Sequence, residues 1–272
     1  MNHPTSRRTK KRLTSRNADK HVLYEESVQA VDTEAAFLAR TYEKIRGKAP
    51  VSLREDFCGS ALLCAEWVKK RGRTATGVDL DPDVLAWGKK RNLAKMGEPG
   101  DRVTLLRQDV RAKVPGTFDV TVALNFSYFV FKTRDDLRAY FESARRTMKK
   151  DGLFFIDLYG GYESFKPMAE RRRMKGFNYV WDQSKIDPIT GFVTNYIHFE
   201  FRDGSRMDRA FTYEWRLWTI PELREVLAEA GFSKSTVYWE DADANGEGTG
   251  RFRPKTTAEQ EAAFVAYVIS EK

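Results

Sequence analysis

Several features that would mark other classes of protein are scarce in this sequence. Only two of the 272 residues are cysteines, Cys58 and Cys64, which are too few for a disulfide framework. No stretch approaches the roughly 20 consecutive apolar residues that a membrane helix needs. The polar amino terminus also lacks the apolar segment of a signal peptide. We therefore expect a cytoplasmic protein that has no membrane partner.

The excess of positive charge is concentrated at the amino terminus. The formal net charge is +8, and residues 1–20 hold seven lysines and arginines against one aspartate. The rest of the chain is therefore nearly neutral. A polar segment without apolar periodicity predicts a basic, disordered tail over 1–20. It leaves room for contact with nucleic acid, but we do not favour this reading because a basic stripe on the folded body is missing.

Polar side chains follow several expected strands at the point where each strand ends. Strand-like segments at 50–56, 74–79, 103–107 and 118–124 run into Glu55, Asp79, Asp109 and Asn125. The carboxyl ends of neighbouring parallel strands line one crevice, where ligands of open α/β sheets bind. Strands alternate with helical segments, as parallel-sheet units require. The sequence thus predicts an α/β protein with a ligand site at these strand ends.

The first turn of this sheet has the composition of a nucleotide-binding turn. Gly59, Ser60 and Ala61 carry little side-chain bulk, so the backbone can approach a ligand closely. Asp79 lies 20 residues after Gly59, the spacing at which an acid accepts hydrogen bonds from a ribose. Each signal alone is weak. Asp81 before Pro82, for example, is the ordinary start of a helix.

Four segments occur in the same order as the motifs of class I S-adenosylmethionine-dependent methyltransferases: EDFCGSA, GVDLD, RQDV and ALNFSYF. The chain resembles this family over roughly residues 50–160. The resemblance implies S-adenosylmethionine as cofactor and a Rossmann-like, doubly wound, seven-stranded sheet with an antiparallel last strand. The first motif departs from the family, because Phe57 and Ala61 stand where glycines are usual. The implied cofactor-binding residues are Tyr24, Glu55, Phe57, Gly59, Asp79, Leu80, Asp109, Val110 and Asn125.

The remaining segments predict a lid over the crevice. From about residue 178 the sequence alternates and turns like a three-stranded antiparallel meander, placed after the fifth strand of the sheet. The arginine-rich segment before it is interpreted as a flap or a solvated helix face. We divide the chain into the tail at 1–20, an amino-terminal cap segment and helix at 21–48, the cofactor-binding core at 49–160, a β lid for substrate at 161–218, and the last part of the core sheet at 219–272.

The expected activity is methyl transfer to nitrogen, or less readily oxygen, of a small-molecule acceptor. The methyl donor is already activated, so the site must hold a lone pair in line and exclude water. Catalytic candidates are Tyr128, Tyr159 and His198, and substrate-binding candidates are Asp157, Tyr213 and Trp215. Aromatic side chains of this kind clasp cations or simply form a core. No metal site is predicted.

Two other functions stay open at this stage. One is an RNA or protein methyltransferase whose basic tail recruits the target, and the other is a non-catalytic module that binds the cofactor and acts through partners. A nicotinamide-dependent oxidoreductase is disfavoured, because the full G-x-G-x-x-G pattern is missing. The sequence predicts neither the acceptor nor the oligomeric state.

Overall fold

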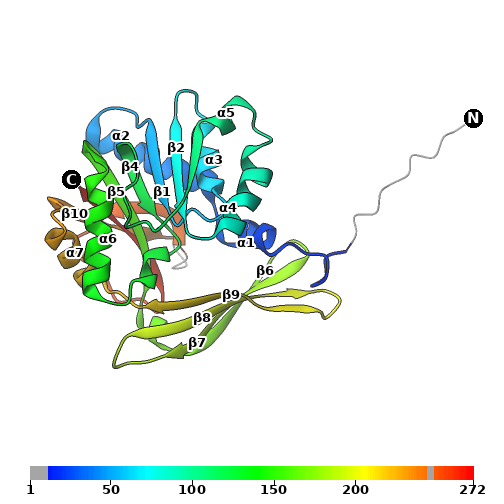
Figure 1. Cartoon of the computed structure of the whole chain (residues 1–272). Helices are drawn as coiled ribbons and strands as arrows, with labels where there is room; N and C mark the ends of the chain where they lie inside the picture. The colour runs from blue at the N-terminus through cyan, green and yellow to red at the C-terminus, as the bar shows by residue number, and fades with distance from the viewer. Residues whose placement is uncertain (1–11, 244–247) are drawn as a thin grey trace, which may run out of the picture.

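The computed structural model describes residues 12–243 and 248–272 (Figure 1). Its centre is an eight-stranded sheet in the order β11-β10-β12-β5-β4-β1-β2-β3. Strands β1 to β5 run parallel to one another, whereas β12 is antiparallel to both β5 and β10. The strands are β1 (Ser52–Asp56), β2 (Thr74–Asp79), β3 (Val103–Arg107), β4 (Phe118–Ala123), β5 (Met148–Gly160), β10 (Lys234–Ala242), β11 (Gly248–Pro254) and β12 (Phe264–Glu271).

This topology confirms the predicted doubly wound sheet with an antiparallel last strand. The eighth strand, β11, was not predicted and pairs antiparallel with β10 at the sheet edge. All six residues of β4 are buried, as the central position of that strand requires.

Helices cover both faces of the sheet. Apolar side chains of α2 (Val31–Arg46), α3 (Leu62–Val68) and α4 (Pro82–Gly88) pack on one face. Those of α6 (Arg134–Arg146) and α7 (Ile220–Glu229) pack on the other. Short helical segments complete the connections: η1 (Lys89–Leu93), α5 (Glu98–Asp101), η2 (Ser127–Val130) and η3 (Tyr162–Phe165).

Local sequence signals account for several helix ends. The Thr133 side chain caps α6, and Thr219 and Glu222 form a capping box at α7. Gly47 ends α2 in the left-handed conformation with φ of 71°. Helix α6 ends at Arg146, and Met148 already belongs to β5.

A second, four-stranded antiparallel sheet forms the lid, in the order β6-β7-β8-β9. It lies beneath the carboxyl ends of the parallel strands (Figure 1). The predicted meander corresponds to β7 (Phe177–Ile186), β8 (Phe192–Phe201) and β9 (Arg206–Arg216). The fourth strand, β6 (Met168–Arg173), contains the arginine run, so the helix-face interpretation was wrong, whereas the flap stays a prediction.

The amino-terminal segment differs from expectation at two places. The start of the cap segment expected over 21–48 is itself a helix, α1 (Lys20–Val28), whose first turn is capped by the Asp19 carboxylate. Leu13 packs against an apolar cluster formed largely by the lid strands, and the Ser15 amide donates to Ser205 Oγ at 3.0 Å. The disordered tail predicted over 1–20 is therefore wrong for residues 12–19, and residues 1–11 lie outside the described part. Within the described ranges, no helix is long and apolar enough to cross a membrane.

Candidate active site

The turn after β1 is built from left-handed backbone and held by Asp79. Phe57, Gly59 and Ala61 have φ values of 57°, 51° and 54°. The Gly59 amide donates to Asp79 Oδ2 at 2.8 Å, and the Asp81 amide donates to Oδ1 at 2.9 Å. The 20-residue spacing of Gly59 and Asp79 therefore reflects a direct contact. The carboxylate of Asp79 keeps further lone pairs for a ligand hydroxyl.

Non-glycine residues in the left-handed region carry a cost of roughly 1–2 kcal/mol each. Packing offsets this cost at Phe57, whose ring contacts Phe131 and Tyr140 at centroid distances of 6.0 and 5.6 Å. The departure of Phe57 from the usual glycine is therefore accommodated by aromatic neighbours in the core.

A small cavity of about 280 Å³ lies against this turn. Six of the nine residues implied for cofactor binding line it: Tyr24, Glu55, Phe57, Gly59, Asp79 and Asn125. The motifs thus converge at one place although they span 102 positions of the sequence, from 24 to 125.

Three implied cofactor residues are not in the lining of this cavity. Asp109 pairs with Arg111 at 2.8 Å, the carbonyl of Val110 accepts from the buried Arg54 at 2.8 Å, and the Leu80 side chain is 63% exposed. A role of these residues in binding the cofactor stays a prediction.

The small cavity suits a positively charged ligand that also carries hydroxyl groups. Glu55 is buried and accepts from the Cys64 amide at 3.0 Å, and burial raises the pKa of its carboxyl to about 8. A cationic group beside Glu55 would favour its charged form. Gln29 also lines the cavity, and its Oε1 atom has no hydrogen-bond partner among the described residues. These acceptor oxygens of Glu55, Asp79 and Gln29 therefore fit the ribose, amino group and sulfonium of S-adenosylmethionine.

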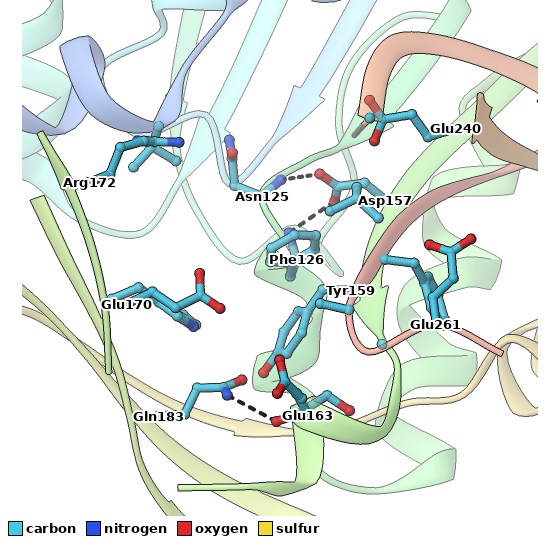
Figure 2. Close-up of a pocket in the computed structure, with 18 of the residues that line it drawn as sticks. Asn125, Phe126, Asp157, Tyr159, Glu163, Glu170, Arg172, Gln183, Glu240 and Glu261 are labelled. Atoms are coloured by element: carbon cyan, nitrogen blue, oxygen red, sulfur yellow. Dashed lines mark hydrogen bonds between the residues drawn. The ribbon is translucent and has the colours of Figure 1, made fainter. Parts of the chain in front are cut away.

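A larger cavity of about 590 Å³ lies between the sheet and the lid (Figure 2). Asp157, near the end of β5, is on its wall and accepts from the amides of Asn125 and Phe126 at 2.8 and 2.9 Å. These two residues have φ values of 56° and 59°, so the carboxylate stabilises a left-handed turn. Burial raises the pKa of Asp157 to about 7.

The two cavities share one wall. Tyr24, Asn125, Tyr213 and Trp215 line both of them. The rings of Tyr213 and Trp215 are 4.4 Å apart, and the Tyr24 and Tyr213 side chains are hydrogen-bonded to each other. All three predicted substrate residues, Asp157, Tyr213 and Trp215, line the larger cavity.

Of the three catalytic candidates, the structure brings only Tyr159 to the larger cavity. Its hydroxyl accepts from Asn195 at 3.2 Å, and burial raises its pKa to about 12. Tyr128 is fully buried and donates to the Asp157 carbonyl at 2.8 Å. That expectation was wrong, since the left-handed turn at Asn125 and Phe126 precedes a segment that turns Tyr128 into the core.

His198 also lies outside both cavity linings. Residues alternate along β8, so Ile197 lines the larger cavity while His198 lies on the opposite face. The His198 ring contacts Asp182 and Asp208 at 3.3 and 3.1 Å. The predicted contact of His198 with the acceptor is therefore not formed in the structure.

Sequence reasoning missed several residues that line the larger cavity. Ser27 and Glu34 come from the amino-terminal helices, Glu170 from β6, and Glu240 from β10. Burial raises the pKa of Glu34 to about 7. No motif identifies these residues, because each reaches the cavity only through tertiary packing.

Comparison with known proteins identifies a methyltransferase domain within this chain. Residues 58–154 match the family model described as a methyltransferase domain. The chain is also similar to a protein named putative methyltransferase YqeM of Bacillus subtilis (strain 168), with 26% identity over 186 residues, covering 66% of this chain and 72% of that protein.

Solved structures have the same fold over nearly the whole chain. A S-adenosylmethionine-dependent methyltransferase from Clostridium acetobutylicum ATCC 824 superposes with a TM-score of 0.68 at 17% identity, covering 92% of this chain and 96% of that one. CalS10, an amino pentose methyltransferase from Micromonospora echinaspora with S-adenosylmethionine bound, gives a TM-score of 0.63 at 18% identity, covering 91% and 95%.

The chain is therefore an enzyme of the methyltransferase class with the Rossmann-like fold. The matched segment is a methyltransferase domain, and the chain shares its fold with S-adenosylmethionine-dependent methyltransferases.

Proposed function

We propose that this enzyme transfers a methyl group to a nitrogen atom of a small-molecule amine. The observation that carries the proposal is the shared wall formed by Tyr24, Asn125, Tyr213 and Trp215. A ligand in the smaller cavity and one in the larger cavity would approach each other beside these four residues, which line both cavities. The volume of the larger cavity, about 590 Å³, falls within the usual range for small-molecule sites.

S-adenosylmethionine, when bound, supplies a methyl group on a positively charged sulfur that a nitrogen lone pair can displace. In the smaller cavity, Asp79 is placed to accept hydrogen bonds from the ribose, and Glu55 is placed to attract positive charge. Tyr24 and Tyr213 line both cavities and would shield the reacting atoms from water, which favours an in-line displacement.

An amine that arrives as an ammonium ion must lose a proton before its lone pair can react. Asp157 is the best-placed acceptor, because its carboxylate lies on the cavity wall beside Asn125, one of the four shared residues. A carboxyl with a pKa of about 7 is suited to proton transfer near neutral pH. Tyr159, with a pKa of about 12, serves as a hydrogen-bond donor rather than as a base.

Nitrogen is preferred over oxygen because the larger cavity is rich in carboxylates and aromatic rings, which attract ammonium ions. A hydroxyl acceptor gains little from this negative lining. The structural similarity to an amino pentose methyltransferase supports the same choice.

The test uses S-adenosylmethionine labelled in the methyl group, incubated with the full chain and a panel of amines, alcohols and short RNA. We expect label on nitrogen of at least one amine, and mass spectrometry locates it. Asp79→Asn should weaken S-adenosylhomocysteine binding by at least roughly tenfold, since a charged hydrogen-bonding group is lost. Asp83→Asn, an exposed neighbour on α4, is the matched control. Label on oxygen or RNA alone would contradict the proposal.

A further inference from the structure

The lining of the larger cavity is strongly unbalanced in charge. Seven of its side chains are carboxylates, and Arg172 is the one cationic side chain among the described lining residues. Two of the carboxylates have cationic partners: Asp241 pairs with Arg253 at 2.8 Å, and Glu163 lies 3.8 Å from Lys166. The others form no salt bridge within the described chain. They are Glu34, Asp157, Glu170, Glu240 and Glu261.

These five carboxylates form an inner and an outer group. Glu34, Asp157 and Glu240 are the inner group: they are buried or half-buried, and all three act electrostatically on Tyr267, which lines the same cavity. Glu170 and Glu261 are the outer group: both are exposed, and they come from opposite sides of the cavity (Figure 2). A single cation cannot neutralise both groups.

A second observation points independently to a bound ligand. Ser27 is only 7% exposed and lines the same cavity, yet its Oγ atom has no hydrogen-bond partner in the described structure. A buried hydroxyl without a partner is unfavourable, so a ligand donor or acceptor is expected there. The guanidinium of Arg172 does not fill this role, because it donates to the Ser27 carbonyl and lies over the Tyr179 ring.

Aromatic rings line the same cavity as the two groups of carboxylates. Trp181 lies 5.8 Å from Tyr213 and 6.1 Å from Trp215, and all three line the cavity. Such rings pack well against the apolar carbons between two charged nitrogens and also attract the charges themselves.

From these observations we infer that the methyl acceptor carries at least two positively charged amino groups, one held by the inner carboxylates and the second by Glu170 and Glu261. This inference rests on the proposed function, and it names the chemical class of the acceptor as a diamine or polyamine. The first amine faces the shared wall, and the second fixes its orientation.

Calorimetry on the full chain saturated with S-adenosylhomocysteine tests the inference. The probes are 1,4-diaminobutane, 1,5-diaminopentane and spermidine, compared with butylamine and pentylamine. We expect each dication to bind roughly tenfold or more tightly than the monoamine of equal length, as a further charged hydrogen bond implies. Equal affinities, or no binding of any probe at millimolar concentration, would overturn the inference.

Variants separate the outer group from the rest of the site. Glu170→Gln combined with Glu261→Gln should lower the preference for diamines by roughly three- to tenfold, because two partly solvated ion pairs are lost. Monoamine affinity should change little. Glu43→Gln combined with Glu142→Gln, on α2 and α6 and outside the cavity lining, is the control and should keep the preference. An unchanged preference in the outer variant would contradict the inference.

The outcome is distinguishable from failure of the proposed function. Monoamines that are methylated on nitrogen as readily as diamines would overturn the dication inference and leave N-methylation intact. Methyl transfer to oxygen alone would overturn the proposed function itself.

Discussion

Replacing Asp157 with asparagine should change how the stability of this protein depends on pH. Burial raises the pKa of Asp157 to about 7 in the folded protein, whereas an unfolded aspartate has a pKa of about 3.9. Between these two values the folded state binds more protons than the unfolded state. Asp157 therefore lowers the free energy of unfolding as pH rises through this window.

The size of the effect follows from the two pKa values. Between pH 5 and pH 8, Asp157 should reduce the free energy of unfolding by about 2.5 kcal/mol. Asparagine does not titrate, so the free energy of unfolding of the Asp157→Asn variant should fall by about 2.5 kcal/mol less than that of the wild type between pH 5 and pH 8. The buried carboxyls of Glu34 and Glu55, with pKa values of about 7 and 8, contribute in the same direction in both proteins.

The substitution also changes stability at fixed pH. The Asn125 and Phe126 amides donate to different oxygens of Asp157, and asparagine replaces one of these oxygens with an NH2 group, which cannot accept. One buried amide is left unpaired, at a cost of about 1–3 kcal/mol. At pH 5, where Asp157 is protonated in the wild type, the cost should be smaller.

Urea unfolding followed by tryptophan fluorescence at pH 5, 6, 7 and 8 measures these differences. Asp135→Asn, at an exposed position on α6, is the control and should follow the wild type. Wild-type and Asp157→Asn curves that decline in parallel would refute the reasoning, because Asp157 would then have no raised pKa in the folded state.

Three other perturbations test the site. Gly88→Ala places a Cβ atom 2.2 Å from the Ser60 carbonyl oxygen. Calorimetry should show at least roughly tenfold weaker S-adenosylhomocysteine binding, and urea unfolding should show a loss of about 1–3 kcal/mol in stability. Binding as tight as that of the wild type would contradict the close packing of this turn. Glu25→Ala removes the acceptor of the Ser60 and Asn92 side chains, both at 2.7 Å, and should lower the free energy of unfolding in urea by about 1–3 kcal/mol. Glu25→Gln keeps an acceptor oxygen and should lower it less. Equal losses of stability in the two variants would argue against this contact. Deleting residues 1–11 should leave amine methylation unchanged, and a steeply salt-dependent loss of activity on RNA would instead support recruitment of nucleic acid by the tail.

The cofactor side of the site could be predicted from the sequence because its signals are local. Gly59 and Asp79 lie at the ends of adjacent parallel strands, so their spacing along the chain translates directly into a contact at 2.8 Å. The order of strands and helices predicted the doubly wound sheet for the same reason. Among the described strands, only β11 at the sheet edge and β6 in the lid were not predicted.

The acceptor side could not be predicted in the same way. The alternation along β8 was correct, but only the packing of the lid determines that the face of Ile197, rather than that of His198, meets the cavity. Tyr128 follows a strand end, yet a left-handed turn directs it into the core. Ser27, Glu34 and Glu170 come from separate elements, and no pattern in the sequence links them.

The most direct test of the central claim is an NMR spectrum of the product made with S-adenosylmethionine labelled with ¹³C in the methyl group and a diamine acceptor. The structure predicts a labelled methyl on nitrogen, formed by the wild type and by Asp83→Asn, and lost together with cofactor binding in Asp79→Asn. A labelled methyl on oxygen, or no transfer by a wild-type protein that binds S-adenosylhomocysteine, would contradict the account.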